Sequence, residues 1–210
     1  MIIIPEMFNK TQITIDKIVR LIISSMIKRR IVGQKFGVVV VGEGIFHFLQ
    51  DEDIASSGIT FDYDAHGHPE LSEVSKAHVI SKILKNRLKE LNLDIICRPV
   101  EVGYSLRCVD PSAFDLTYCT TLGIGVKKLY DEGHSGCMVA VNLEEEVIPV
   151  YLKDVEDEHG KIRTRLVNID KEVVRQTLAE NIYYLTAQDR SLARKWLADP
   201  EPFEYERILG

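Results

Sequence analysis

Short apolar runs alternate along the chain with segments in which apolar residues recur every three or four positions. The runs are rich in β-branched residues and are typical of strands covered on both faces; they span residues 1–4, 36–41, 93–97 and 136–141. Between them, helical spacing covers residues 14–30, 70–91 and 112–132. This order predicts the α/β class, with a three-layer, mostly parallel sheet and helices on both faces.

The pattern changes after residue 142, where acidic residues interrupt the alternation. Residues 147–152 and 162–169 suit two strands that leave the main sheet, and Asp170 can cap a following helix. A short helix over 192–197, with Trp196 docking it on the body, completes a helical C-terminal tail. We therefore expect one domain over 1–142 and a second part, 143–210, in which a strand pair and helices pack on the first.

Composition excludes several classes of partner. Of the 210 residues 45% are hydrophobic and 28% charged, which is ordinary for a globular protein, and no apolar stretch is long enough for a membrane span. A net charge of −6 argues against nucleic-acid binding, and the basic run at 28–30 suits a helix C-terminus. Four cysteines without paired spacing favour reduced thiols and a cytoplasmic location.

The candidate site begins where the predicted strand 93–97 ends. Arg98, Gly103, Tyr104 and Arg107 follow that strand, and parallel sheets place ligands at the carboxyl ends of their strands. The planar fork of arginine suits phosphate or carboxylate, although a lone arginine is more often solvated or paired with an acid. Gly42-Glu43-Gly44 follows strand 36–41 in the same way, either as a ligand loop or as a plain turn. Both loops are expected to face one crevice.

Other motifs favour structural roles. Gly123 and Gly125 fall inside a helical pattern, so close packing explains them better than a dinucleotide site does. His78 lies among apolar neighbours and is expected to be a partly buried, hydrogen-bonded histidine. No spacing typical of a metal site or of a nucleophile with its base occurs. The sequence thus predicts a binding crevice without a catalytic base and without a metal site.

The stretch from Arg98 through Gly103, Tyr104 and Arg107 to the Pro-Ser-Ala-Phe-Asp sequence at 111–115 resembles the carboxyl-terminal half of 6-phosphofructokinases. The opening Ile-Pro-Glu at 4–6 and the strand ending at Gly42-Glu43-Gly44 match that family in the same order, so the resemblance runs from residue 1 to about 142. It implies that Glu43 binds hydroxyls of fructose 6-phosphate and that Arg98 and Arg107 hold its 6-phosphate.

Further implications concern the assembly and the phosphoryl donor. Arg98 would reach across from a neighbouring subunit, which implies a homo-oligomer. Tyr104 stands where many ATP-using members have histidine, which favours the pyrophosphate-dependent branch over ATP. The family usually has proline at the position of Gly42. The donor loop and catalytic aspartate that the family carries upstream do not occur here, so Mg²⁺, the donor (ATP or pyrophosphate) and the base would belong to a missing half.

The resemblance therefore implies a phosphotransferase of glycolysis, which makes fructose 1,6-bisphosphate and is expected to be inactive as this chain alone. The alternative is a non-catalytic sugar-phosphate-binding or regulatory subunit.

Overall fold

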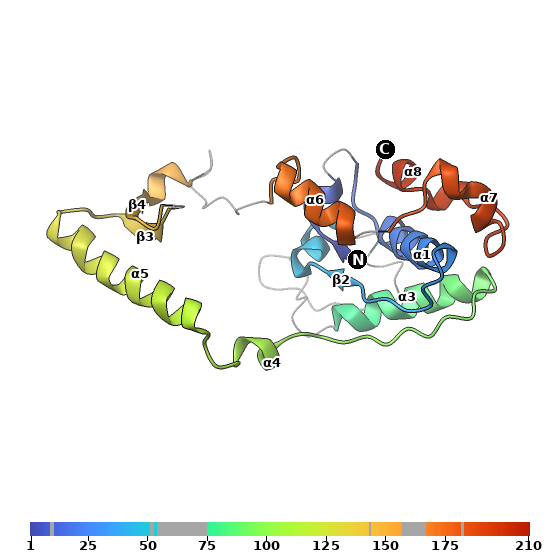
Figure 1. Cartoon of the computed structure of the whole chain (residues 1–210), viewed down its shortest axis with the longest axis horizontal. Helices are drawn as coiled ribbons and strands as arrows, with labels where there is room; N and C mark the ends of the chain where they lie inside the picture. Colours follow the sequence, from blue (N-terminus) through green and yellow to red (C-terminus); the bar gives the residue numbers. More distant parts are fainter. Residues whose placement is uncertain (9–10, 51–52, 54–74, 143, 157–166, 182) are drawn as a thin grey trace. The chain divides into compact units, whose positions relative to one another are not determined.

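The computed structural model describes residues 1–8, 11–50, 53, 75–142, 144–156, 167–181 and 183–210 (Figure 1). Its elements make a mixed α/β chain with long helices and a few short strands. The chain divides into two units: Met1–Glu101 with Val167–Gly210, and Val102–Leu166. The domain boundary expected at residue 142 stays a prediction.

The core of the first unit is built around helix α1 (Ile15–Ile31). Its N-terminus is capped by Thr14, whose hydroxyl accepts a hydrogen bond from the backbone N–H of Lys17 at 3.2 Å. Its C-terminus is followed by Gly33, whose φ of +84° is a conformation that glycine adopts without strain. The helix predicted over 14–30 is thereby confirmed, including both ends.

Helix α1 is buried on more than the one face that its apolar stripe predicted. Leu21 and Ile27 are fully buried in addition to the predicted stripe, and Met26, a predicted core residue, is only partly buried. The reason is that α1 contacts α3 (Lys76–Glu90), α7 (Arg190–Ala193) and α8 (Tyr205–Leu209) together (Figure 1). A helix covered on several sides needs apolar residues at most positions.

Strands β1 (Ile2–Ile3) and β2 (Val40–Val41) pair in parallel, with α1 as the connection between them. This strand–helix–strand unit agrees with the predicted alternation. Two apolar runs that were predicted as strands differ from the prediction. In residues 36–41 only the last two form a strand, and residues 93–97 form none. Phe36 and Ile96 are each 81% exposed, and no strand among the described residues covers these runs.

The three-layer parallel sheet is therefore not shown in the described part of the chain, which contains two separate two-stranded sheets. The second sheet joins β3 (Cys137–Val141) to β4 (Val147–Tyr151) in antiparallel register, with Val139 opposite Pro149. The strand at 136–141 was expected in the parallel sheet, and its partner is instead the next strand of the sequence. A short connection allows only the antiparallel pairing. Most of the strand expected at 162–169 lies outside the described residues.

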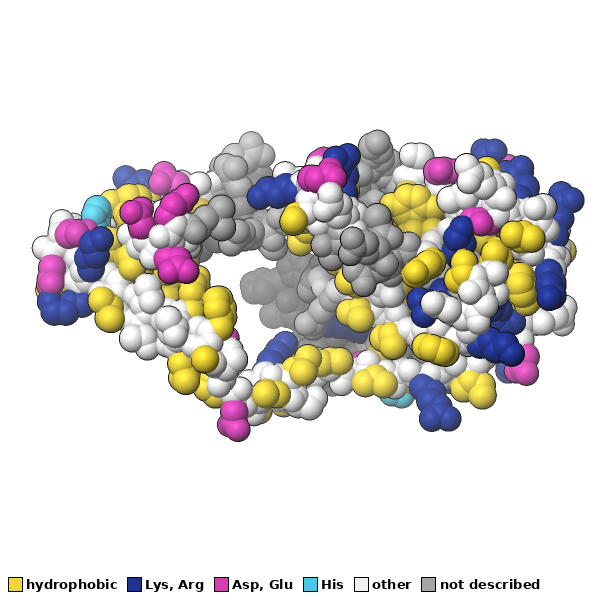
Figure 2. Space-filling model, in the orientation of Figure 1, with side chains coloured by type: hydrophobic (Ala, Val, Ile, Leu, Met, Phe, Trp, Pro, Cys, Tyr) yellow, Lys and Arg dark blue, Asp and Glu magenta, His cyan; other side chains and the backbone are white. Residues whose placement is uncertain are grey.

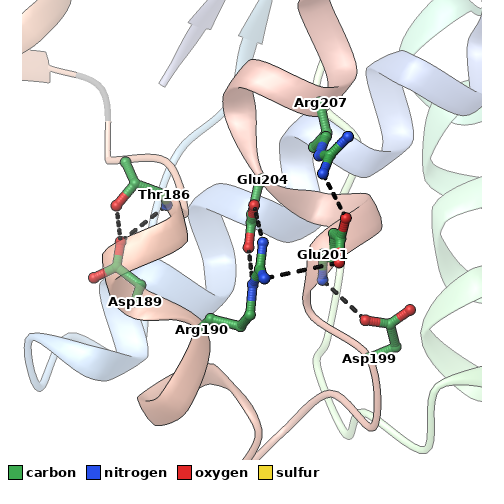
Figure 3. Close-up of polar contacts among 7 residues, drawn as sticks. All are labelled: Thr186, Asp189, Arg190, Asp199, Glu201, Glu204 and Arg207. Carbon is green, nitrogen blue, oxygen red and sulfur yellow. Dashed lines mark hydrogen bonds and ion pairs between the residues drawn. The ribbon is translucent and has the colours of Figure 1, made fainter.

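The C-terminal segment returns to the first unit with α6 (Glu172–Asn181), α7 and α8. Trp196 is partly buried and packs against the core, as expected. Polar contacts also stabilise the segment (Figure 3). Arg190 donates two hydrogen bonds to the carboxylate of Glu204, at 2.6 and 2.8 Å, and Glu204 is only 2% exposed. The short helices of this tail are thus held to each other by a buried carboxylate as well as by apolar packing.

The second unit consists of α4 (Tyr104–Arg107), α5 (Ala113–Asp131) and the β3–β4 hairpin. Helix α5 packs on the hairpin at Gly125, where an added Cβ would lie 2.7 Å from Val139 Cγ2 and 2.8 Å from Val147 Cγ1. Close packing therefore explains Gly125, as predicted. It does not explain Gly123, where an added Cβ would meet nothing within 4 Å.

Many apolar side chains of α5 are exposed, and polar ones lie among them (Figure 2). Its exposed large apolar side chains are Phe114, Leu116, Tyr118, Ile124, Val126 and Tyr130. The rings of Phe114 and Tyr118 stack on each other with centroids 5.7 Å apart. None of the described helices combines the length and apolar character that a membrane span requires.

Candidate functional site

Tyr104 and Arg107 share one short helix of the second unit. They are the first and last residues of α4, three positions apart, so both side chains lie on the same face of the helix. Tyr104 is 78% exposed, and Arg107 is exposed as well. Neither side chain has a hydrogen-bond or ion-pair partner among the described residues. An exposed phenol and an exposed guanidinium are therefore both available to a ligand at this helix.

The sequence around α4 explains why these residues are presented in this way. The helix begins after Gly103 and ends at Cys108, whose backbone N–H donates to the carbonyl of Tyr104 at 2.8 Å. A capping box then starts α5: Ser112 Oγ accepts from the N–H of Asp115 at 3.3 Å, and Asp115 Oδ2 accepts from the N–H of Ser112 at 2.8 Å. The Ser112 hydroxyl also donates to that carboxylate, and these bonds lower the pKa of Asp115. The Pro-Ser-Ala-Phe-Asp motif thus fixes the start of α5.

Arg98 and Glu43 belong to the first unit. Arg98 is exposed in the extended segment that follows α3, without a partner in the described part of the chain. Glu43 begins the 3-10 helix η2 (Glu43–Phe48) directly after β2, so the predicted position at the end of a strand is confirmed for its backbone. Its side chain lies outside the described part of the structure. The structure thus brings Tyr104 and Arg107 together, and the single crevice expected for all four residues stays a prediction.

Nothing in the described residues fits a magnesium ion. Within the described ranges no group of three or more His, Cys, Asp or Glu side chains lies together in a way that could hold a metal. Hard cations require several oxygen ligands. This part of the chain therefore supplies no metal site from which a catalytic step could be derived.

The basic residues 28–30 at the end of α1 have specific partners that the sequence did not predict. Lys28 Nζ donates to Asp189 Oδ1 at 2.6 Å, and Arg29 Nε donates to the carbonyl of Phe36 at 2.7 Å. Arg30 donates to the carbonyl of Asp94 at 3.1 Å. Besides complementing the helix dipole, these residues tie the segment just after α1 and two distant segments to this helix. Only the Thr-x-x-Asp spacing at 186–189, a capping box in the structure, could have pointed to Asp189.

His78 also differs from expectation. The residue is exposed, although a partly buried position was predicted. Its Nδ1 lies 2.6 Å from the hydroxyl of Ser75, which also caps α3 by accepting from the backbone N–H of His78. The hydrogen bond expected for this histidine is present, but its side chain is exposed and not partly buried.

Comparison with known proteins finds relatives among the pyrophosphate–fructose 6-phosphate 1-phosphotransferases. The chain is 31% identical to a pyrophosphate–fructose 6-phosphate 1-phosphotransferase of Naegleria fowleri, over 81% of this chain and 41% of that protein. It is 29% identical to the protein of the same name from Thermotoga maritima, over 95% of this chain and 46% of that protein. The beta subunit of the Solanum tuberosum enzyme is 22% identical over 75% of this chain and 37% of that protein. No protein-family model matches the chain.

The chain is therefore a distant homologue of the pyrophosphate-dependent phosphofructokinases, at 22–31% identity over most of its length. This confirms the resemblance seen in its motifs and the pyrophosphate-dependent branch that Tyr104 favoured. The chain spans less than half the length of these relatives.

Proposed function

We propose that this chain is the fructose-6-phosphate-binding half of a pyrophosphate-dependent 6-phosphofructokinase. The observation that carries the proposal is the similarity to the Thermotoga maritima enzyme, which extends over 95% of this chain but 46% of that protein. The name of that relative specifies pyrophosphate, fructose 6-phosphate and transfer to the 1-position. A chain that matches less than half of such an enzyme is suited to one of its binding functions. Its motifs resemble those that bind the sugar phosphate in this family.

In this proposal Arg98 and Arg107 hold the 6-phosphate, Tyr104 donates a hydrogen bond to it, and Glu43 accepts hydrogen bonds from sugar hydroxyls. The exposed and unpartnered state of Arg107 supports the assignment, because a guanidinium already paired with an acid would have to leave its partner first. Binding of the remote phosphate orients the reacting end of the sugar, so its binding energy contributes to catalysis at the other end. Arg98 reaches the site from a second copy, which makes the working form a homo-oligomer.

The remaining parts of the reaction lie outside this role. Phosphoryl transfer requires a donor, a metal and a group that accepts the proton of the attacking hydroxyl, all positioned together. In the complete enzyme Mg²⁺ would supply charge neutralisation at the donor phosphates. We assign the donor, metal and base to another segment, and we expect this chain alone to bind substrate in the cytoplasm without turning it over.

Calorimetric titration with fructose 6-phosphate tests the proposal. We expect the chain to bind the sugar phosphate and Arg107→Ala to lose about tenfold or more in affinity, since a charge-assisted hydrogen bond contributes about 1.5–3 kcal/mol. Arg194→Ala is the matched control, because Arg194 is equally exposed but lies on the C-terminal tail of the other unit. Equal affinity in the two variants would contradict the assignment.

If the chain alone does not bind, the titration is repeated after co-expression with the donor-binding half of the Thermotoga maritima relative. Phosphorylation of fructose 6-phosphate by that pair, and its loss in Arg107→Ala, would support the half-enzyme role. Absence of both binding and turnover in the pair would refute it.

A second candidate is a non-catalytic, sugar-phosphate-binding subunit. The observation that favours it is that plant relatives are named as beta subunits, so members of this homologous group occur as components of assemblies. Sugar-phosphate binding without turnover in the reconstituted pair would favour this second candidate.

A further inference from the structure

The segment that follows α3 turns back along the helix, and the two line a half-open cavity of about 500 Å³. Asn92, in the left-handed conformation with φ of 54°, makes the turn, and the N–H of Leu93 donates to the carbonyl of Leu88 at 2.8 Å. The hydrogen bond from Arg30 to the carbonyl of Asp94 ties the segment to α1 as well. Both walls belong to the first unit, so the cavity is formed within that unit.

One wall of this cavity is a basic stripe. His78, Lys82, Lys85 and Lys89 all line the cavity, and their spacing of four, three and four residues places them on one face of α3. Asp94 is the one acidic residue among those that line it. The three lysines are exposed and have no hydrogen-bond or ion-pair partner in the described part of the chain. Their positive charge is therefore not neutralised within the described structure.

A second feature of the same wall is Ser81. This residue lines the cavity and is only 7% exposed, and its Oγ has no hydrogen-bond partner among the described residues. A buried hydroxyl without a partner is costly, and a ligand oxygen in the cavity would supply the missing acceptor. Leu88, Leu93 and Ile95 add apolar surface that suits a carbon skeleton.

We propose that this cavity binds a small molecule that carries two or more phosphoryl groups. A volume of about 500 Å³ lies within the usual range of small-ligand pockets. Lys82 and Lys89 are seven residues apart, about 10 Å along a helix axis, so they can contact groups at two ends of one ligand. The net charge of −6 disfavours binding of a long polyanion such as a nucleic acid. Glu43, Arg98, Tyr104 and Arg107 are not among the residues that line the cavity, so this proposal uses different residues from the one for fructose 6-phosphate.

Inorganic triphosphate is a suitable probe, because it presents several phosphoryl groups and no sugar. We expect the whole chain to bind it, and the double variant Lys82→Gln/Lys85→Gln to lose about tenfold or more in affinity, from the removal of charge-assisted hydrogen bonds. The matched control is Lys128→Gln/Lys153→Gln, which removes the same charge from exposed lysines of the other unit. Ser81→Ala is expected to weaken binding by a smaller factor. Circular dichroism of each variant checks that the fold is retained.

Amide NMR spectra locate the bound probe, with chemical-shift changes expected for residues 78–89 and 93–99.

Arg107→Ala is expected to leave triphosphate binding unchanged. The experiment therefore distinguishes an error in the proposed sugar-phosphate site from an error in this proposal. Absence of triphosphate binding by the unmodified chain, or an equal loss in the two double lysine variants, would overturn the proposal.

Discussion

The hydroxyl of Ser24 accepts a hydrogen bond from the backbone N–H of Leu185 at 2.8 Å, although 161 residues separate the two. Both residues are fully buried. The bond joins the middle of α1 to the returning C-terminal segment, where Leu185 also forms a parallel bridge with Glu204. The N–H of Leu185 has no access to water, so a water molecule cannot take the place of the Ser24 hydroxyl as its acceptor.

Ser24→Ala should therefore destabilise the first unit by about 1–3 kcal/mol, the cost of leaving a buried N–H without an acceptor. Urea unfolding followed by the fluorescence of Trp196 measures the change, because this tryptophan packs on the same core. Ser191→Ala, on an exposed position of α7, is the control and should change the unfolding free energy by less than about 0.5 kcal/mol. Equal stability of the two variants would show that the Ser24 bond is not needed.

The Arg190–Glu204 pair should make the first unit sensitive to acid. Hydrogen bonds from Arg190 lower the pKa of Glu204 below its ordinary value of 4.5. Burial acts to raise the pKa of Asp189, but hydrogen bonds from Lys28 and Thr186 outweigh it and lower that pKa below 3.8. A carboxyl with a lowered pKa contributes stability that is present above its unfolded pKa and is lost as the pH falls through the folded value.

We therefore expect the unfolding free energy to be constant above about pH 5 and to fall as the pH drops below about 4. Glu204→Gln should lower stability at neutral pH and flatten this acid dependence. Glu206→Gln, an exposed change in helix α8, which Glu204 precedes as its N-cap, should leave the profile unchanged. Urea titrations at a series of pH values give the result. An unaltered acid slope in Glu204→Gln would contradict the role of this pair (Figure 3).

Two glycines of α5 offer a matched test of packing in the second unit. Gly123→Ala should stabilise the helix by up to about 1 kcal/mol, because alanine has the higher helix propensity and the added methyl meets open space. Gly125→Ala should lose about 1–3 kcal/mol, since its methyl would collide with Val139 and Val147. Hydrogen exchange of the β3 and β4 amides measures both effects. The same sign for both variants would refute the packing described here.

The exposed apolar side chains of α5 should make the isolated chain self-associate. Ile124 is 67% exposed, and large exposed apolar patches promote association. Ile124→Glu should lower the mean mass measured by analytical ultracentrifugation, whereas Thr117→Glu adds the same charge at an exposed polar position of α5 and should have little effect. A monodisperse monomer for the unmodified chain would count against its role as half of a larger enzyme.

Tyr104 offers a second test of the proposed sugar-phosphate site. Tyr104→Phe removes only the hydroxyl and should weaken fructose 6-phosphate about tenfold if that hydroxyl donates to the phosphate. Tyr130→Phe is the control, because Tyr130 is equally exposed, at 79%, within the same unit. Calorimetric titration distinguishes the two variants, and unchanged affinity in Tyr104→Phe would remove the tyrosine from the site.

The sequence by itself determined the local features. Apolar spacing and capping residues defined α1 and α5 closely, because Thr14 and Ser112 satisfy the first N–H groups of their own helices. The motif from Arg98 to Asp115 also identified the homologous group, since it depends on residue types and spacing and not on packing.

Tertiary structure decided what lies next to each of these elements. Apolar runs at 36–41 and 93–97 are strand-like in composition, yet a strand needs a hydrogen-bonded neighbour, and only Val40 and Val41 find one in the described structure. In the same way β3 pairs with β4 because the intervening turn is short. The burial of Ser24, Asp189 and Glu204 depends on contacts between segments far apart in the chain, and local pattern carries no information about such contacts.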